Sequence, residues 1–171
     1  CSPWESKPEN LHNFMEKIQP DYGWGNKAIE VGLAHVNREI EKGEVSQVIL
    51  IGDASANTKE EVLSKRSTRG EQYWKNTKLF PTPTYCENEL SRLKKHNVPV
   101  HAFFTGIFAK QGFAAIATAT NGRCEQLDIN SNRGSEQLTD LVSEEVLRNA
   151  GGANGNDFVE AYRAKFSKSF T

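Results

Sequence analysis

The chain contains few cysteines, no long hydrophobic run and almost no excess of one charge. Its three cysteines, Cys1, Cys86 and Cys124, are odd in number and far apart, which is neither a disulfide framework nor a zinc-binding pattern. We therefore expect a reducing compartment, with the cytoplasm favoured. No apolar stretch approaches the roughly 20 residues that cross a bilayer, so we expect no membrane span. The start of the chain lacks the pattern of a signal peptide. A chain that begins with Cys1-Ser2 could be a fragment of a longer protein or a bacterial lipoprotein, and we expect the fragment.

The charge balance excludes further classes of partner. The chain has 21 Lys and Arg residues and 22 Asp and Glu residues, for a net charge of −1. A nucleic acid or an anionic membrane would call for a clear basic excess, so we expect neither as a partner. Hydrophobic residues make up 37% of the 171 residues, which is somewhat low for an α/β domain. We therefore expect that another segment or chain contributes to the core.

The most hydrophobic stretch is Val48-Ile49-Leu50-Ile51, which runs directly into Gly52-Asp53. A short, fully apolar and β-branched run predicts a strand that is buried on both faces. In an open parallel sheet, ligands bind at the carboxyl ends of the strands. Asp53 is therefore the first candidate for a functional residue.

Helical and strand patterns alternate along the rest of the chain. Apolar residues at helical spacing predict helices near 9–18, 27–42, 86–96, 108–120, 134–149 and 156–167. Strands are expected near 46–52, 98–104 and 124–128. A long polar and irregular segment is expected over 54–84, with a helix start over 57–61 and anchored by Tyr73, Trp74, Leu79 and Phe80. This order predicts a parallel sheet with right-handed crossovers. Three strands would leave an exposed edge, so either strands in the first 25 residues escape detection or something outside the chain completes the sheet.

The order of motifs from about Gly23 to Asn149 resembles the carboxyl-terminal portion of a von Willebrand factor A (vWA) domain. The matching pieces are Asn26 to Leu33, Val48 to Ala54, Val98 to Phe103, Ile116 to Arg123 and Leu138 to Arg148. The resemblance implies a Rossmann-like, three-layer α/β sandwich with a mostly parallel central sheet, incomplete on its N-terminal side. We expect residues 1–22 to form a lead-in with a short helix, and residues 23–171 to form the vWA-like domain.

The resemblance also implies a Mg²⁺ site at the carboxyl edge of the sheet, where a partner's carboxylate completes the coordination. Mg²⁺ prefers oxygen ligands in an octahedral array. The resemblance carries over one ligand from the third loop, Asp53, with Ser55 and Asp21 as further candidates. The family's first strand and its Asp-x-Ser-x-Ser loop are not found in this chain, so we expect a degenerate site that binds Mg²⁺ weakly or not at all.

Two alternatives remain for the segment after the central strand. Asp53-Ala54-Ser55-Ala56-Asn57 itself resembles the family's first loop, although the flanking helices fit the third loop better. Asp53 could also serve only as the N-cap of the next helix, because its carboxylate would accept hydrogen bonds from free backbone amides.

The leading functional hypothesis is a non-enzymatic protein–protein interaction domain. Its binding surface would be the carboxyl edge of the sheet, formed by the turn over 21–26, the segment 53–57 and the loop after Phe104. Trp24, Asn26 and Asn57 are the candidate partner-binding residues, since tryptophan is enriched at interface hot spots.

Two other hypotheses belong to different classes. One is an enzyme of α/β hydrolase or phosphotransfer type that uses Asp53 as nucleophile or metal ligand. It requires a second group, such as Asp128 or His101, to converge on Asp53. The other is a structural subunit whose sheet is completed by a neighbouring chain.

Overall fold

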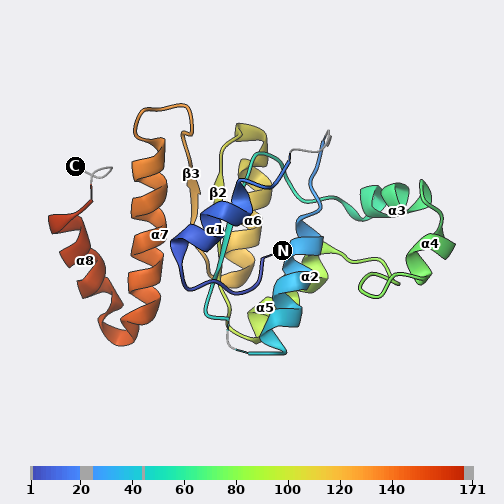
Figure 1. Cartoon of the computed structure of the whole chain (residues 1–171), viewed down its shortest axis with the longest axis horizontal. Helices are drawn as coiled ribbons and strands as arrows, with labels where there is room; N and C mark the ends of the chain where they lie inside the picture. The colour runs from blue at the N-terminus through green and yellow to red at the C-terminus, as the bar shows by residue number, and fades with distance from the viewer. Residues whose placement is uncertain (1, 20–24, 44, 168–171) are drawn as a thin grey trace.

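The computed structural model describes residues 2–19, 25–43 and 45–167, and the fold is α/β with helices on both faces of a parallel sheet (Figure 1). The helices are α1 (Pro8–Met15), α2 (Ile29–Ile40), α3 (Lys59–Ser67), α4 (Glu71–Lys75), α5 (Cys86–Lys95), α6 (Lys110–Thr120), α7 (Gly134–Ala150) and α8 (Gly155–Lys165). Two short 3₁₀ segments, η1 (Ile107–Ala109) and η2 (Gly152–Asn154), precede α6 and α8. No described helix combines the length and the hydropathy that crossing a membrane requires.

The sheet consists of β1 (Val48–Gly52), β2 (Val100–Phe104) and β3 (Cys124–Gln126), in that spatial order and all parallel. This confirms the three predicted strands. The register places Gly52 beside Phe104, and Phe104 beside Gln126. The three strands therefore end at one edge of the sheet, and the loops that follow them share that edge.

The larger core lies on the face of the sheet covered by α2, α5 and α6. Alternate residues of β2, namely Val100, Ala102 and Phe104, point into it, as alternation along a strand requires. Leu33 of α2, Leu93 of α5 and Phe113 and Ile116 of α6 complete this buried cluster. These positions follow the helical periodicity that the sequence predicted.

The opposite face is covered by α7, with α8 packed on the outer side of α7 (Figure 1). Its apolar core is small and consists of Phe103, Leu127 and Leu141, against which Ile49, Leu138 and Val142 pack. Figure 1 shows α7 and α8 on one side of the strands and α2, α5 and α6 on the other. The arrangement is thus a three-layer sandwich with a second layer that is thinner than the first.

Strand β1 forms an edge of the sheet within the described residues. The N–H of Val48 donates to Pro99 and the carbonyl of Gly52 accepts from Thr105, so the even-numbered residues of β1 bond to β2. By alternation, the N–H and C=O groups of Ile49 and Ile51 face away from β2. The side chain of Ile51 is 47% exposed, in contrast to the strand buried on both faces that the sequence predicted.

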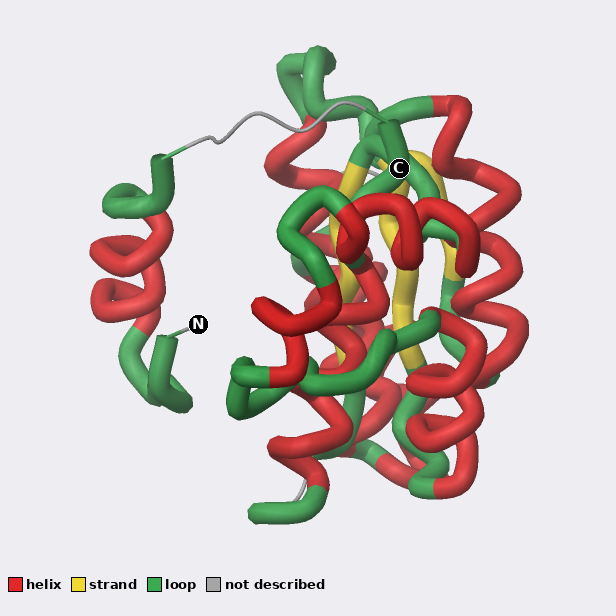
Figure 2. Tube along the Cα trace, turned by 90° about the vertical axis from the view of Figure 1, so that its right-hand side faces the viewer, coloured by secondary structure: helices red, strands yellow, loops and turns green. Residues whose placement is uncertain are grey.

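Helix α1 does not bury any of its residues. Leu11 and Met15, which the sequence placed on an apolar face, are exposed, as is Ile18 beyond the end of the helix. Figure 2 shows α1 standing apart from the packed body of the molecule. Trp4, just before the helix, reaches that body through a hydrogen bond from its indole N–H to Glu39 of α2.

The segment over 54–84 contains α3, at the helix start that the sequence predicts over 57–61, and also α4, which the prediction of an irregular loop missed. Thr58 caps α3, since its hydroxyl accepts from the N–H of Glu61 and the Glu61 carboxylate accepts from the N–H of Thr58. Trp74 does anchor the segment, with its indole N–H donating to the carbonyl of Arg66. Tyr73 and Leu79 do not, because both side chains are exposed.

Candidate functional site

The carboxyl end of the sheet brings together the loops that follow β1, β2 and β3. The first two loops touch, because a Cβ on Gly106 would lie 2.7 Å from the carbonyl oxygen of Asp53. Only glycine fits at this contact without moving the backbone. Thr105 reinforces it by donating its N–H to the carbonyl of Gly52 over 2.9 Å.

Asp53 is exposed at this end of the sheet, and its carboxylate makes no hydrogen bond or ion pair with another described residue. It does not cap α3, because Thr58 does, and this rules out the N-cap alternative. Ser55 is turned inward against α6, where a Cβ on Gly112 would lie 2.6 Å from its hydroxyl oxygen. Among the described residues that were predicted as ligands, Asp53 thus presents a free carboxylate at the end of β1.

The described residues do not fit a metal ion at this position. They contain no group of three or more His, Cys, Asp or Glu side chains that could hold one. Asp21, the third predicted ligand, lies outside the described residues, as does Trp24. The Mg²⁺ site and the partner-binding role of Trp24 therefore remain predictions.

Asn26 and Asn57 take part in a network that joins α2 to α3. The Asn57 side chain is buried, and it donates to Glu30 over 2.9 Å and accepts from Lys65. The Asn26 side chain donates to Glu61 over 2.9 Å, and its carbonyl accepts from Lys65. Both amides thus hold the β1–α3 turn in place, and their predicted role in binding a partner stays a prediction.

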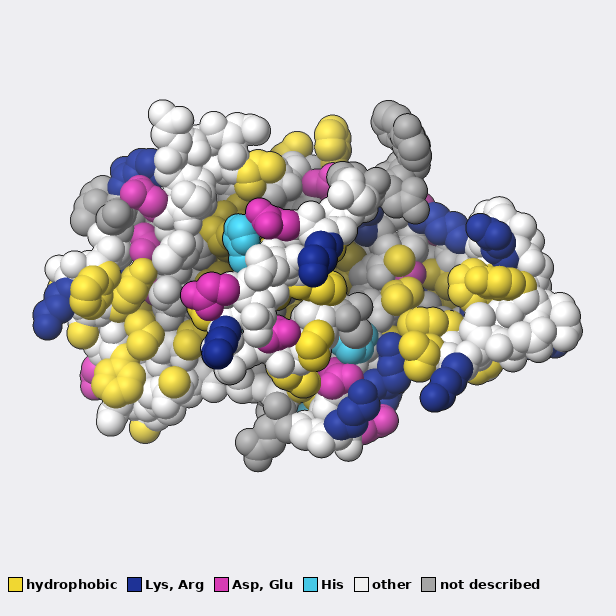
Figure 3. All heavy atoms as spheres, in the orientation of Figure 1, with side chains coloured by type: hydrophobic (Ala, Val, Ile, Leu, Met, Phe, Trp, Pro, Cys, Tyr) yellow, Lys and Arg dark blue, Asp and Glu magenta, His cyan; other side chains and the backbone are white. Residues whose placement is uncertain are grey.

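Exposed apolar side chains lie in the loops at this end of the sheet. Phe108, in the loop after β2, is 93% exposed, and its neighbour Ile107 is 58% exposed. Ile129, in the loop after β3, is exposed as well. Hydrophobic side chains protrude at the top of the view in Figure 3, the end at which the strands terminate. This end therefore combines a free carboxylate with uncovered apolar groups.

The groups that an Asp53-based enzyme would need do not converge on Asp53. His101 pairs with Ile49 in the register, four residues before Asp53, or about 13 Å along the strand. Asp128 follows β3, with β2 in between, and its carboxylate accepts from the N–H of Asn130 in its own loop. Burial raises the pKa of Cys86 to about 11 and also raises that of Cys124, so neither is an activated thiol.

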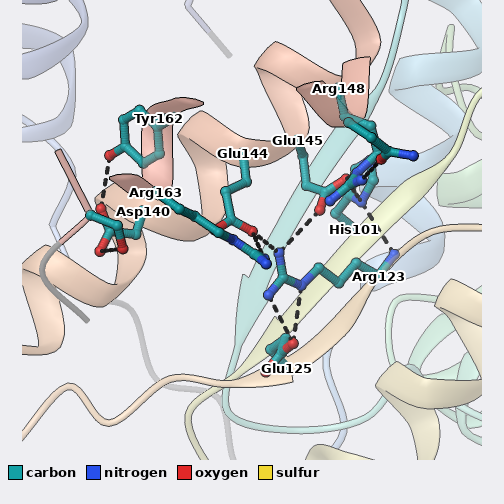
Figure 4. A network of polar contacts seen from close by, with 11 residues as sticks. His101, Arg123, Glu125, Asp140, Glu144, Glu145, Arg148, Tyr162 and Arg163 are labelled. Carbon is teal, nitrogen blue, oxygen red and sulfur yellow. Dashed lines mark hydrogen bonds and ion pairs between the residues drawn. The ribbon is translucent and has the colours of Figure 1, made fainter. Parts of the chain in front are cut away.

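A dense polar network lies toward the opposite, amino end of the sheet (Figure 4). We call its six charged residues the arginine–glutamate network: Arg123, Glu125, Glu144, Glu145, Arg148 and Arg163. Arg123, just before β3, donates to Glu144 over 2.7 Å, to Glu145 over 3.2 Å and to Glu125 over 3.0 Å. Arg163 of α8 makes two 2.7 Å bonds to Glu144. The network thus ties β3, α7 and α8 together.

His101 borders this network. Its side chain is 7% exposed, and its Nδ1 atom accepts the backbone N–H of Arg123 over 3.2 Å and lies 3.5 Å from Glu145. Burial lowers the pKa of His101 below its ordinary value, an effect that Glu145 opposes and Arg123 and Arg148 reinforce. The ring is therefore held neutral at neutral pH.

A cavity of about 440 Å³ opens between His101 and the network. Its wall includes Gln47, Asn121, Arg123, Glu145, Arg148 and Asn149. Asn121 has the left-handed φ of 58° that ends α6, and Gly122 follows it so closely against Val100 that a Cβ would lie 2.0 Å from the Val100 carbonyl oxygen. The turn after α6 thus forms part of the cavity.

Sequence reasoning missed this cluster. From the sequence, His101 is a candidate only as a partner for Asp53, and Arg123 only closes the matching piece that begins at Ile116. One signal was available: Glu145 lies four residues after Leu141, on the inward stripe of the predicted helix. An acidic residue on an apolar stripe indicates a buried partner of opposite charge.

Comparison of the chain with protein-family models, with curated proteins and with solved structures finds no match.

Proposed function

We propose that the chain is a non-enzymatic, protein-binding domain of the vWA type that meets its partner at the carboxyl end of the sheet. The observation that supports this proposal is the exposure of Phe108, at 93%, on the loop that abuts Asp53. Exposing an aromatic ring to water is unfavourable in the free protein, and burial of such a ring makes it a favoured anchor in an interface. The ordered motifs that resemble a vWA domain support the same surface.

The chemistry of this surface indicates the kind of partner. Ile107 and Phe108 supply apolar area beside the free carboxylate of Asp53. A complementary surface would offer an apolar pocket with a basic side chain at its rim. Asp53 then contributes as a charge and does not depend on a complete metal site.

The test compares proteins captured by the tagged chain and by two variants. Phe108→Ser removes the proposed anchor, and Phe158→Ser is the matched control, because Phe158 is a half-exposed phenylalanine on α8. We expect a partner that is retained by Phe158→Ser and lost or weakened at least about tenfold by Phe108→Ser. Equal retention by both variants would show that the carboxyl end is not the binding surface.

A second candidate function, a subunit whose sheet is completed by a neighbouring chain, is favoured by the open edge of β1. Ile49 and Ile51 point their backbone groups away from β2, and no described strand pairs with them. Val48 to Gly52 contains no charge and no proline, so the edge lacks the usual protection against pairing with another strand.

Proline substitutions test this second function. Ile51→Pro removes an N–H that faces away from β2, so the fold should survive while pairing at the edge is blocked. Leu50→Pro is the contrasting variant, because it removes an N–H directed at β2 and should unfold the strand. If copies of the chain complete each other's sheets, light scattering after size exclusion will show a dimer that Ile51→Pro converts to monomer. A monomeric parent chain would rule out such pairing between copies.

A further inference from the structure

The cavity beside His101 lies toward the amino end of the sheet and has no part in the proposed binding surface. Two enclosed polar groups of its wall are the carboxylate of Glu145 and the imidazole of His101, on residues that are 4% and 6% exposed. The Nδ1 atom is occupied by the N–H of Arg123, whereas Nε2 has no partner among the described residues. Nε2 of His101 is therefore an unmatched polar atom at the cavity wall, whereas the buried unmatched side-chain atom of the wall is Oε1 of Gln47.

The hydrogen bond from Arg123 decides which nitrogen of His101 bears the proton. A neutral imidazole that accepts at Nδ1 has its hydrogen on Nε2. Because burial holds the ring neutral, Nε2 is a donor at neutral pH. A ligand that forms a hydrogen bond with Nε2 of His101 must therefore supply the acceptor atom.

The charged groups of the wall also favour an acceptor. Glu145 is the acidic residue of the wall, and both of its oxygens are already engaged, one by Arg123 and the other by Arg148. Arg148 uses Nε on Glu145 and Nη1 on Asn156, while Nη2 has no partner in the described part of the chain. The wall thus contains two arginines and one glutamate. Both carboxylate oxygens of the glutamate accept hydrogen bonds from arginine, and Nη2 of Arg148 is left as a donor for a ligand.

We propose that this cavity binds a small molecule through an oxyanion, a carboxylate or a phosphate, which accepts hydrogen bonds from Nε2 of His101 and from the guanidinium of Arg148. Charge-assisted bonds to arginine suit both kinds of oxyanion. The volume of about 440 Å³ lies within the range of small-molecule sites. The side chain of Asn121 adds a further amide at the wall.

The test is a titration of the whole chain, followed by NMR of its histidine side chains at pH 7.5 and constant ionic strength. Inorganic phosphate and acetate are the two probes, and chloride is the control anion. We expect phosphate, acetate or both to shift the Nε2 signal of His101 in a saturable manner. His12, His35 and His96 serve as internal references that should not saturate. The probe that binds decides between phosphate and carboxylate.

Arg148→Gln should weaken the binding at least about tenfold, because it removes a charge-assisted donor. Arg133→Gln is the matched control, since Arg133 adjoins the other end of α7 and is exposed, and it should bind as the parent chain does. Circular dichroism checks that both variants fold, and Arg148→Lys, which keeps the charge, should lose less affinity than Arg148→Gln. Shifts that are linear for both probes, or equal affinities in the Arg148→Gln and Arg133→Gln chains, would overturn the proposal.

Discussion

The backbone N–H of Arg123 donates to Nδ1 of His101 over 3.2 Å, while the Arg123 guanidinium bonds to Glu144 and Glu145. One residue thus orients the histidine of β2 and neutralises two carboxylates of α7. The bond ties the protonation state of His101 to the folded structure, because Nδ1 accepts only in the neutral ring. The stability of the fold should therefore respond to pH near neutrality.

We expect the free energy of unfolding to fall as the pH drops from 7.5 to 5.5. Burial lowers the pKa of His101 in the folded state below its ordinary value of 6.5. The unfolded chain then takes up a proton below about pH 6.5 that the folded chain does not, so acid favours unfolding. Urea unfolding at the two pH values measures this slope. His101→Gln should flatten it, and His12→Gln, on exposed α1, should not; equal slopes in both variants would contradict the assignment.

Glu144→Gln should destabilise the fold strongly. The Glu144 side chain has 0% exposure and accepts from both Arg123 and Arg163. The amide removes the buried negative charge that Arg123 and Arg163 share, and breaking a buried ion pair costs about 3–5 kcal/mol. Urea unfolding gives the value. Glu87→Gln, in an exposed pair with Lys59, is the control and should change stability little; a similarly small change at Glu144 would show that the network does not stabilise the fold.

Asn57→Ala should destabilise the fold because it leaves Glu30 without a donor. Glu30 is 4% exposed, one of its oxygens accepts from Asn57, and the other has no partner within the described residues. An unsatisfied buried polar group costs about 1–3 kcal/mol. Adding Glu30→Gln removes the charge and should restore part of the loss in urea unfolding. If the two losses simply add, the two side chains are not coupled.

Calorimetric titration with Mg²⁺, Mn²⁺ and Ca²⁺ should show weak binding or none by this chain. Asp53 is the free carboxylate at the end of β1, and the described residues contain no cluster that could hold a metal ion. Hard divalent cations need several oxygen ligands. Micromolar binding that Asp53→Ala abolishes would instead demonstrate a working metal site.

Several features of the fold could be predicted from short-range patterns. The apolar run from Val48 to Ile51 predicts β1, and the helical spacing of Leu90 and Leu93 predicts α5. Both depend on the preference of neighbouring residues for one backbone geometry and one buried face. The excursion over 54–84 was harder, because α3 and α4 are short and polar, so they lack an apolar stripe. The sequence pattern that predicts α3 is the capping box formed by Thr58 and Glu61.

The candidate sites also combine features that the sequence predicts with features that depend on the tertiary structure. The sequence by itself determined that Asp53 follows a strand and that the loop after Phe104 shares its edge, because parallel strands end together. Only the tertiary structure decided that Asn57 turns inward, that β1 is an edge strand among the described residues, and that His101 meets Arg123 and Glu145. His101 and Arg123 are 22 residues apart, and Glu145 is another 22 residues further along. Their contact depends on the order of the strands and the placement of α7, which no local pattern encodes.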